Sequence, residues 1–142
     1  MAYRIEFYED EHCVEPVLRW LREELTPAQR RAMGVAMREV LEEMGVGVCE
    51  TEFGRQLGGG LFEFRLRQDA EEVLRRVGKE PRRAEPKGER ILLRVFCHAY
   101  GDRVILLLGG YDKGRDPKGR RQQREIEGAR DRLADFRRRR QA

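Results

Sequence analysis

Two nearly continuous apolar runs in the second half of the chain limit most strongly what it can fold into. They span residues 91–99 and 103–111, and the turn residues Tyr100, Gly101 and Asp102 join them. Long apolar runs separated by a short glycine-containing turn predict the two strands of a β-hairpin. Since few polar side chains interrupt either run, we expect the sheet that contains this hairpin to be covered on both faces or nearly so.

The rest of the chain supplies two more strands and three helices. Period-two alternation predicts the additional strands, and apolar residues at helical spacing predict the helices. Thr26 and Pro27 form a helix start, because Thr can cap the first turn and Pro suits its first position. In chain order the predicted elements are a strand at 3–8, helices at about 14–25 and 27–44, a strand at 61–66, the two hairpin strands, and a helix at about 118–138.

This order of elements predicts one domain of the α+β class. The 142 residues fit a single domain. Helices lie early and late while the three later strands are consecutive, which indicates an antiparallel sheet. Residues 45–60 are expected to form a connection, with a turn at Gly58, Gly59 and Gly60. A phosphate loop would need a Gly-Lys-Ser or Gly-Lys-Thr ending after a strand.

The segment 68–90 is a charged insertion in this domain. It holds too few apolar residues to offset the entropy of ordering all of it. Val73, Leu74 and Val77 allow a helical turn or two in its first part. We therefore predict that the segment is mobile or projects from the domain, and that the arginines at 137–140 are frayed.

Charge is divided unevenly along the chain. Residues 1–64 carry 7 Lys and Arg against 13 Asp and Glu, whereas residues 65–142 carry 23 against 13. The two parts thus have net charges of −6 and +10 within a total of +4. Such asymmetry indicates an anionic partner for the basic part, although solvated helix faces produce the same composition.

The cysteines and the N-terminus bear on localisation. Cys13, Cys49 and Cys97 are an odd number of cysteines without a Cys-x-x-Cys pair. This argues against a disulfide framework and a zinc site, so we expect no metal and no cofactor. The start lacks the pattern of a signal peptide, and no apolar run reaches the roughly 18 residues of a membrane span. We therefore expect a cytoplasmic protein without a membrane partner.

The candidate site rests on basic residues within or next to apolar strands. Arg65 and Arg94 each lie between two apolar residues of a predicted strand. Lys113 follows the last strand, two residues after Tyr111. A guanidinium in such a place needs a carboxylate, a phosphate or water, and a salt bridge to Glu63 or to another carboxylate is an alternative for any one of them. Three such cations on one sheet favour a site for an anion.

Several segments together resemble the RelE/HigB toxin superfamily, and its phage-derived HigB-like branch in particular. The resemblance lies in Leu-Gly-Gly-Gly-Leu-Phe-Glu-Phe-Arg at 57–65, Ile-Leu-Leu-Arg-Val-Phe at 91–96, Ile-Leu-Leu-Leu-Gly-Gly-Tyr-Asp-Lys at 105–113, Pro117, and Arg-Glu-Ile-Glu-x-Ala at 124–129. The ordered spacing covers about half of the chain. The resemblance implies a RelE-like fold, a small antiparallel sheet with two N-terminal helices and a C-terminal helix.

The resemblance also implies a function. Typical members of the family are toxins of type II toxin–antitoxin pairs, which enter the ribosomal A site and cleave mRNA without a metal. It implies that Arg65 and Arg94 hold the scissile phosphate. It also implies that Lys113 is the basic residue after the last strand, and that Tyr111 stacks on a base or assists proton transfer. The expected partners are mRNA, the ribosome with its ribosomal RNA, and a cognate antitoxin with a helix-turn-helix.

The chemistry of such a reaction fits these residue types. When an RNA 2′-hydroxyl attacks the adjacent phosphorus, the phosphorane gains negative charge that fixed cations stabilise. His98 is the histidine of the predicted sheet, and strand alternation places it on the same face as Arg94. It is a candidate base or acid, with an ordinary core or surface histidine as the alternative. The candidate RNA-binding residues are Arg115, Lys118, Arg120, Arg121 and Arg124.

Other functions fit the same sequence. ParE-type members of the superfamily share the fold and inhibit DNA gyrase without cutting RNA. A basic RNA-binding module without chemistry is a third alternative. Segment 68–90 is longer than the tight turn of the relatives, and Asp112 can offset the charge of Lys113. Arg65, Arg94 and Lys113 favour the ribosome-dependent endonuclease over both alternatives.

Overall fold

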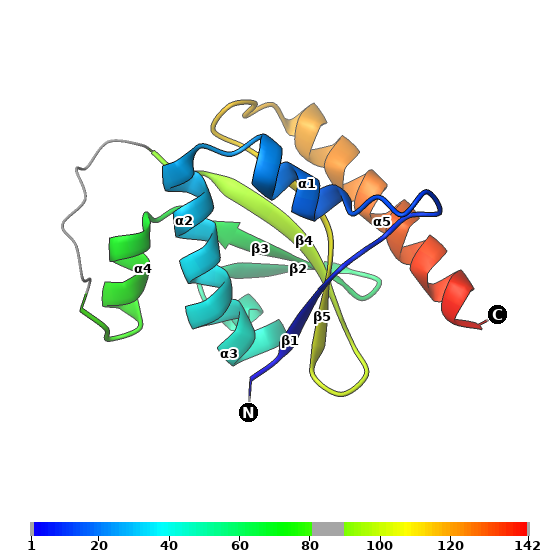
Figure 1. The fold of residues 1–142 in the computed structure, drawn as a ribbon, viewed down its shortest axis with the longest axis horizontal. Coiled ribbons are helices and arrows are strands. Elements are labelled where there is room, and N and C mark those ends of the chain that lie inside the picture. The colour runs from blue at the N-terminus through cyan, green and yellow to red at the C-terminus, as the bar shows by residue number, and fades with distance from the viewer. Residues whose placement is uncertain (1, 81–89, 142) are drawn as a thin grey trace.

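The computed structural model describes residues 2–80 and 90–141, which form an α+β fold around a five-stranded mixed sheet (Figure 1). The strands are β1 Arg4–Phe7, β2 Gly54–Gly58, β3 Leu61–Leu66, β4 Leu93–Tyr100 and β5 Val104–Asp112, in the spatial order β1-β5-β4-β3-β2. The helices are α1 Pro16–Glu23, α2 Pro27–Ala36, α3 Glu42–Met44, α4 Ala70–Arg76 and α5 Gly119–Gln141. A π-helical turn, Met37–Leu41, joins α2 to α3, and a 3-10 helix, Gly45–Glu50, follows.

Local sequence signals account for several of these elements. The predicted hairpin is β4 and β5, and β3 has the predicted bounds. Thr26 caps α2 as predicted. Its Oγ1 accepts a hydrogen bond from the Gln29 N–H at 3.1 Å, and Gln29 Oε1 accepts one from the Thr26 N–H at 3.0 Å. This reciprocal arrangement satisfies two N–H groups that the helix itself leaves unpaired.

The sheet differs from the prediction in two respects. β1 pairs with β5 in parallel, with Arg4 opposite Val104, so the prediction of a wholly antiparallel sheet is wrong. β2 lies within the segment expected to be a connection and pairs with β3 in antiparallel fashion. Alternation reports which side chains share a face, but it does not report the neighbour or the direction of pairing. The turn predicted at Gly58–Gly60 does join β2 to β3, and the glycines have φ between +66° and +87°.

The two faces of the sheet are covered by different helices. On one face Phe64 packs with Met33 of α2 in the larger apolar cluster. On the other, which we call the α5 face, Phe96 packs with Leu133 of α5. Figure 1 shows the sheet between α2 on one side and α5 on the other. The expectation that both faces are covered is confirmed.

The charged insertion begins as a helix that packs beside α2. The Asp69 side chain caps α4 by accepting a hydrogen bond from the Glu72 N–H at 2.9 Å, and Val73 is buried. The helical turns predicted around Val73 are therefore confirmed. Residues 81–89 lie outside the described residues, so the predicted mobility of that part stays a prediction.

The C-terminal helix is longer than expected. α5 continues through residues 137–140 to Gln141, so the prediction that these arginines fray is wrong. Two of them are bonded to the domain. Arg137 donates a hydrogen bond to the Gly59 carbonyl at 3.2 Å, and Arg139 donates one to the Glu9 carbonyl at 2.6 Å. These contacts hold the last turns of α5 in place.

Candidate functional site

Three sequence-predicted site residues lie in one row across the sheet. Arg65 of β3 is opposite Arg94 of β4, and Arg94 is opposite Tyr111 of β5. Residues that are directly opposite on neighbouring strands point to the same face. Here that is the α5 face, because Tyr111 belongs to the apolar cluster of α5. The row places two guanidinium groups and a phenol side by side.

Arg94 is almost completely buried, with 2% of its surface exposed. Its Nη1 donates a hydrogen bond to the Leu93 carbonyl at 3.1 Å, and its Nε lies 3.6 Å from Glu63 Oε1. Burial lowers the pKa of Arg94, and the nearby Glu63 carboxylate opposes that shift. The ion pair with Glu63, one of the alternatives that the sequence left open, is thus present, but at a distance longer than a hydrogen bond.

Glu63 is a site residue that sequence reasoning named only as a possible partner. It lies two residues before Arg65 on β3, so it shares the α5 face, and it is 1% exposed. Gln122 of α5 donates a hydrogen bond to its Oε1 at 3.2 Å, and Arg55 Nε of β2 lies 3.4 Å from its Oε2. A carboxylate between two phenylalanines of a predicted strand was the signal that could have identified it.

Four buried side-chain atoms lack hydrogen-bond partners among the residues that the structure describes. They are Glu63 Oε2, Arg65 Nε, Arg94 Nε and Tyr111 Oη. All four belong to adjacent positions on β3, β4 and β5, and we call these residues the sheet cluster. Folded proteins pair nearly all their buried polar groups, since each unpaired group costs about 1–3 kcal/mol. The cost is therefore concentrated in one place, and that place contains three residues predicted from the sequence.

The hydroxyl of Tyr111 retains its proton at neutral pH. The side chain is 1% exposed, its ring stacks on Phe96 at a centroid distance of 6.2 Å, and the Arg121 guanidinium lies 5.6 Å from its centre. Burial, and then the charge of Glu63, raise the pKa of Tyr111 to about 12. Tyr111 can therefore donate a proton or a hydrogen bond but is a poor base.

Lys113 lies beside the sheet cluster and is partly exposed. Its backbone N–H donates to the Leu92 carbonyl at 2.8 Å, which fixes the chain just after β5. Burial lowers the pKa of Lys113, and the positive charges of Arg94, Arg67 and Arg55 lower it further while Glu63 opposes them. These mutual effects place several cations close enough to repel one another.

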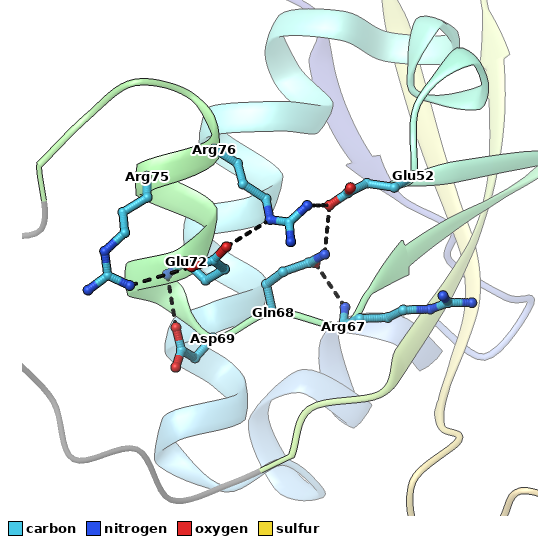
Figure 2. Close-up of polar contacts among 7 residues, drawn as sticks. All are labelled: Glu52, Arg67, Gln68, Asp69, Glu72, Arg75 and Arg76. Carbon is cyan, nitrogen blue, oxygen red and sulfur yellow. Dashed lines mark hydrogen bonds and ion pairs between the residues drawn. The ribbon is translucent and has the colours of Figure 1, made fainter.

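The Arg67 side chain extends away from α4 (Figure 2), and its positive charge lowers the pKa of both Arg94 and Lys113. Figure 2 shows its guanidinium extending away from the polar network that joins β3 to α4. In that network Gln68 donates to Glu52 at 2.8 Å, and Arg76 binds both Glu52 and Glu72. The network holds α4 against the end of β3 and leaves Arg67 facing solvent near Lys113.

His98 does not join the sheet cluster. It faces the α5 side, as alternation predicted, but it is four residues from Arg94 on β4, a separation of roughly 13 Å at the usual rise of a strand. Its Nδ1 is 2.8 Å from the Gly60 carbonyl and therefore donates to it. Burial lowers the pKa of His98, and the Gly60 carbonyl partly offsets this. The imidazole lies beside the β2–β3 turn.

The predicted RNA-binding residues gather around the start of α5. A hollow is lined by Asp116, Lys118, Arg120, Arg121 and Arg124. Arg121 is held in place by Glu125 at 2.8 Å and is near Asp116. Among the described residues, no hydrogen bond or ion pair engages the exposed side chains of Arg115, Lys118, Arg120 and Arg124.

Arginines farther along α5 bind the protein itself. Arg130 donates to the carbonyls of Leu57 and Gly58 at 2.8 and 3.0 Å, and Arg132 donates to the Leu108 carbonyl at 2.8 Å. These contacts, like those of residues 137–140, attach α5 to the sheet. The basic surface at the start of the helix is the part left for an anionic partner.

Comparison with protein-family models and with curated proteins gave no match. In the described part of the chain, no three His, Cys, Asp or Glu side chains are grouped so that they could hold a metal ion. Residues 2–80 and 90–141 also contain no helix that is long and apolar enough to cross a membrane. The sheet cluster and the cations around it are therefore the features of the described chain that bear on function.

Proposed function

We propose that this protein is the toxin of a type II toxin–antitoxin pair, a RelE/HigB-like endoribonuclease that cleaves mRNA on the ribosome without a metal. One observation carries the proposal. Of the four buried side-chain atoms without a hydrogen-bond partner in the described chain, three belong to Arg65, Arg94 and Tyr111, which the family resemblance selects. The fourth belongs to Glu63. Unpaired buried groups of this kind are kept where a ligand or a reaction uses them.

The charges around the sheet cluster suit a phosphodiester. The positive charges of Arg55, Arg67 and Arg94 all act on Lys113, and Glu63 is the carboxylate set among them. Crowding like charges is unfavourable unless an anion joins them. A phosphate group supplies that anion, and arginine binds it with two parallel hydrogen bonds.

The proposed reaction is an intramolecular transesterification. The 2′-oxygen forms a bond to the adjacent phosphorus, and the bond from phosphorus to the 5′-oxygen breaks. The products are a 2′,3′-cyclic phosphate and a 5′-hydroxyl. The 2′-hydroxyl gives up its proton, and the leaving 5′-oxygen takes one. The transition state carries more negative charge than the diester, so fixed cations lower its energy more than that of the substrate.

Burial suggests how the residues divide this work. Arg65 and Lys113 are partly exposed and would contact the phosphate first. Arg94 lies behind them and would reinforce the positive potential. Tyr111, whose pKa is raised, would give a proton to the leaving oxygen. His98 remains a candidate base, but its place near the β2–β3 turn makes it a weaker one.

The proposal assigns the exposed start of α5 to ribosomal RNA and the sheet cluster to mRNA. A cognate helix-turn-helix antitoxin would silence the protein by covering the cations with an acidic or apolar segment. The protein would act in the cytoplasm, where ribosomes are.

Primer extension on mRNA from a translation reaction tests the proposal. We expect new 5′-ends with wild-type protein, no new ends with Arg65→Ala, and no effect of EDTA on the cleavage step where ribosomes stay intact. Arg19→Ala, at an exposed position of α1, is the matched control and should cleave like wild type. Absence of cleavage at full ribosome occupancy would refute the proposal. Inhibition of gyrase supercoiling by the same preparation would then favour the ParE-like alternative.

A further inference from the structure

Glu63 is the carboxylate of the sheet cluster, and three other elements converge on it. Arg94 reaches it from β4, Arg55 from β2 and Gln122 from α5. Its side chain is 1% exposed, while that of Arg55 is 49% exposed. Glu63 is therefore at the centre of the group and Arg55 at its solvent edge.

A purely structural role accounts poorly for this arrangement. Buried ion pairs add little stability, because desolvation offsets the attraction between the charges. A structural carboxylate would also be expected to accept hydrogen bonds at both oxygens, yet Glu63 Oε2 has none among the described residues. The buried position of Glu63 instead suits a carboxylate that orients a neighbouring cation.

Arg94 depends on Glu63 for its orientation. Among the described residues its side chain makes a single hydrogen bond, from Nη1 to the Leu93 carbonyl, and Leu93 is its own neighbour in β4. That contact fixes one end of the guanidinium. Glu63 is the group that lies against its Nε, at 3.6 Å.

We propose that Glu63 is a positioning residue, which holds the Arg94 guanidinium against the row of site residues and, through Gln122, ties the start of α5 above it. The inference rests on the proposed function, in which Arg94 contributes to stabilising the phosphorane. Glu63 acts through Arg94 and does not touch the phosphate. Its charge balances that of Arg94 in the free protein, and its geometry directs Arg94 toward the reacting phosphorus.

Kinetics of charge and length variants test this role. In Glu63→Gln the carboxylate charge is lost at nearly constant size, and we expect kcat to fall about 10–100-fold, the usual range for removing an orienting group in metal sites. KM should stay constant or fall, because the surface becomes more positive. Glu63→Asp keeps the charge and should restore part of the rate. Glu127→Gln removes an exposed carboxylate of α5 and should leave the rate unchanged.

A double variant separates positioning from other roles. If Glu63 acts through Arg94, then Glu63→Gln lowers the rate no further once Arg94→Gln is present. Additive losses would overturn the proposal, and so would a Glu63→Gln enzyme with wild-type kcat. If Glu63→Gln does not fold, Glu63→Asp carries the test, because its shorter arm should still lower kcat without changing KM.

The Nε–H signal of Arg94 in ¹⁵N-labelled protein gives a readout that needs no cleavage. We expect it to shift and to exchange faster with water in Glu63→Gln, and to stay unchanged in Glu127→Gln. An unshifted signal in Glu63→Gln would refute positioning even if wild type cleaves RNA. A shifted signal in a protein that never cleaves RNA would refute the proposed function and leave the coupling of Glu63 to Arg94 intact.

Discussion

The α5 face has two ends that treat polar groups in opposite ways. Around the β2–β3 turn, Arg130, Arg137 and His98 donate hydrogen bonds to backbone carbonyls of residues 57–60. At the other end, four buried side-chain atoms of the sheet cluster lack hydrogen-bond partners among the described residues. We call these the paired end and the unpaired end. Basic residues at the paired end stabilise the fold, whereas those at the unpaired end keep side-chain donors that are available to bind a ligand.

The comparison shows why a count of basic residues does not locate a site. α5 carries arginines along its whole length, and Arg124 and Arg130 look alike in the sequence. In the structure Arg130 donates to two carbonyls, whereas the described residues offer Arg124 no hydrogen bond or ion pair. What separates them is the tertiary contact of the helix with the β2–β3 turn.

The largest effect is expected at the unpaired end. Arg65→Gln should lower the rate of mRNA cleavage about 10²–10³-fold, as loss of one preorganised donor does in other enzymes. Its side chain is partly exposed, so the unfolding midpoint should change little. Primer extension at matched ribosome occupancy and thermal unfolding measure the two effects. A cleavage rate within threefold of wild type would remove the unpaired end from the site.

Arg94→Ala is expected to lose the same activity but also stability. It leaves the Glu63 carboxylate buried without its buried partner, a change that costs about 3–5 kcal/mol in other proteins. Denaturant unfolding of Arg65→Gln and Arg94→Ala side by side measures the difference. Equal free energies of unfolding for the two variants would show that the Glu63–Arg94 ion pair does not stabilise the fold.

Tyr111→Phe should separate function from stability. The hydroxyl has no partner among the described residues, so removing it should raise the free energy of unfolding by about 1 kcal/mol. The cleavage rate should fall about 10²-fold, because the variant cannot donate the proton. Chemical denaturation and cleavage kinetics on the same preparation show whether the free energy of unfolding rises and the cleavage rate falls. A variant that is less stable than wild type would argue that the hydroxyl is paired.

The same variant should alter the response to alkaline pH. The pKa of Tyr111 is raised from 10.0 to about 12, so the folded state holds the proton longer than the unfolded state does. The resulting stability is present below pH 10 and is lost as the pH rises toward 12. Tyr111→Phe lacks the titrating hydroxyl, so this contribution to the loss of stability at alkaline pH should be absent. Denaturant unfolding at a series of pH values between 9 and 12 measures it.

A smaller effect distinguishes the two kinds of arginine on α5. Arg130→Gln should lower the free energy of unfolding by about 1 kcal/mol, because two carbonyls lose a donor. Arg124→Gln should leave stability unchanged and reduce the salt dependence of RNA binding by about 0.7 in the log–log slope, the value for one phosphate contact. Thermal unfolding and RNA titration at several salt concentrations, carried out on both variants, measure these two effects. A loss of stability in Arg124→Gln together with a reduced salt slope in Arg130→Gln would contradict the assignment of these two arginines.

Local signals in the sequence predicted a substantial part of this structure. The apolar runs around Gly101 gave the β4–β5 hairpin, and Thr26 gave the start of α2. Strand alternation also placed His98 on the face of β4 that carries Arg94. These features depend on residues close together in the chain, or on the simple period of a strand.

Features that depend on distant parts of the chain were not predicted. The parallel pairing of β1 with β5 joins segments about a hundred residues apart, and β2 is a short strand with glycine at each end. Glu63 stands between two phenylalanines in the sequence, but its burial depends on where α5 packs, and Gln122 of that helix contacts it. The division of α5 into bonded and available arginines likewise follows from packing.

The smallest effect is expected for His98, the candidate that the sequence placed in the site and the structure places at the paired end. Its imidazole already donates to the Gly60 carbonyl and packs against Phe136 of α5. It is also four positions along β4 from Arg94. His98→Gln retains a donor, so it should change the cleavage rate less than threefold and stability by about 1 kcal/mol or less. Cleavage kinetics and unfolding of the variant measure both. A loss as large as that of Arg65→Gln would make His98 part of the site, and the boundary between the paired and unpaired ends would have to move along β4 to include it.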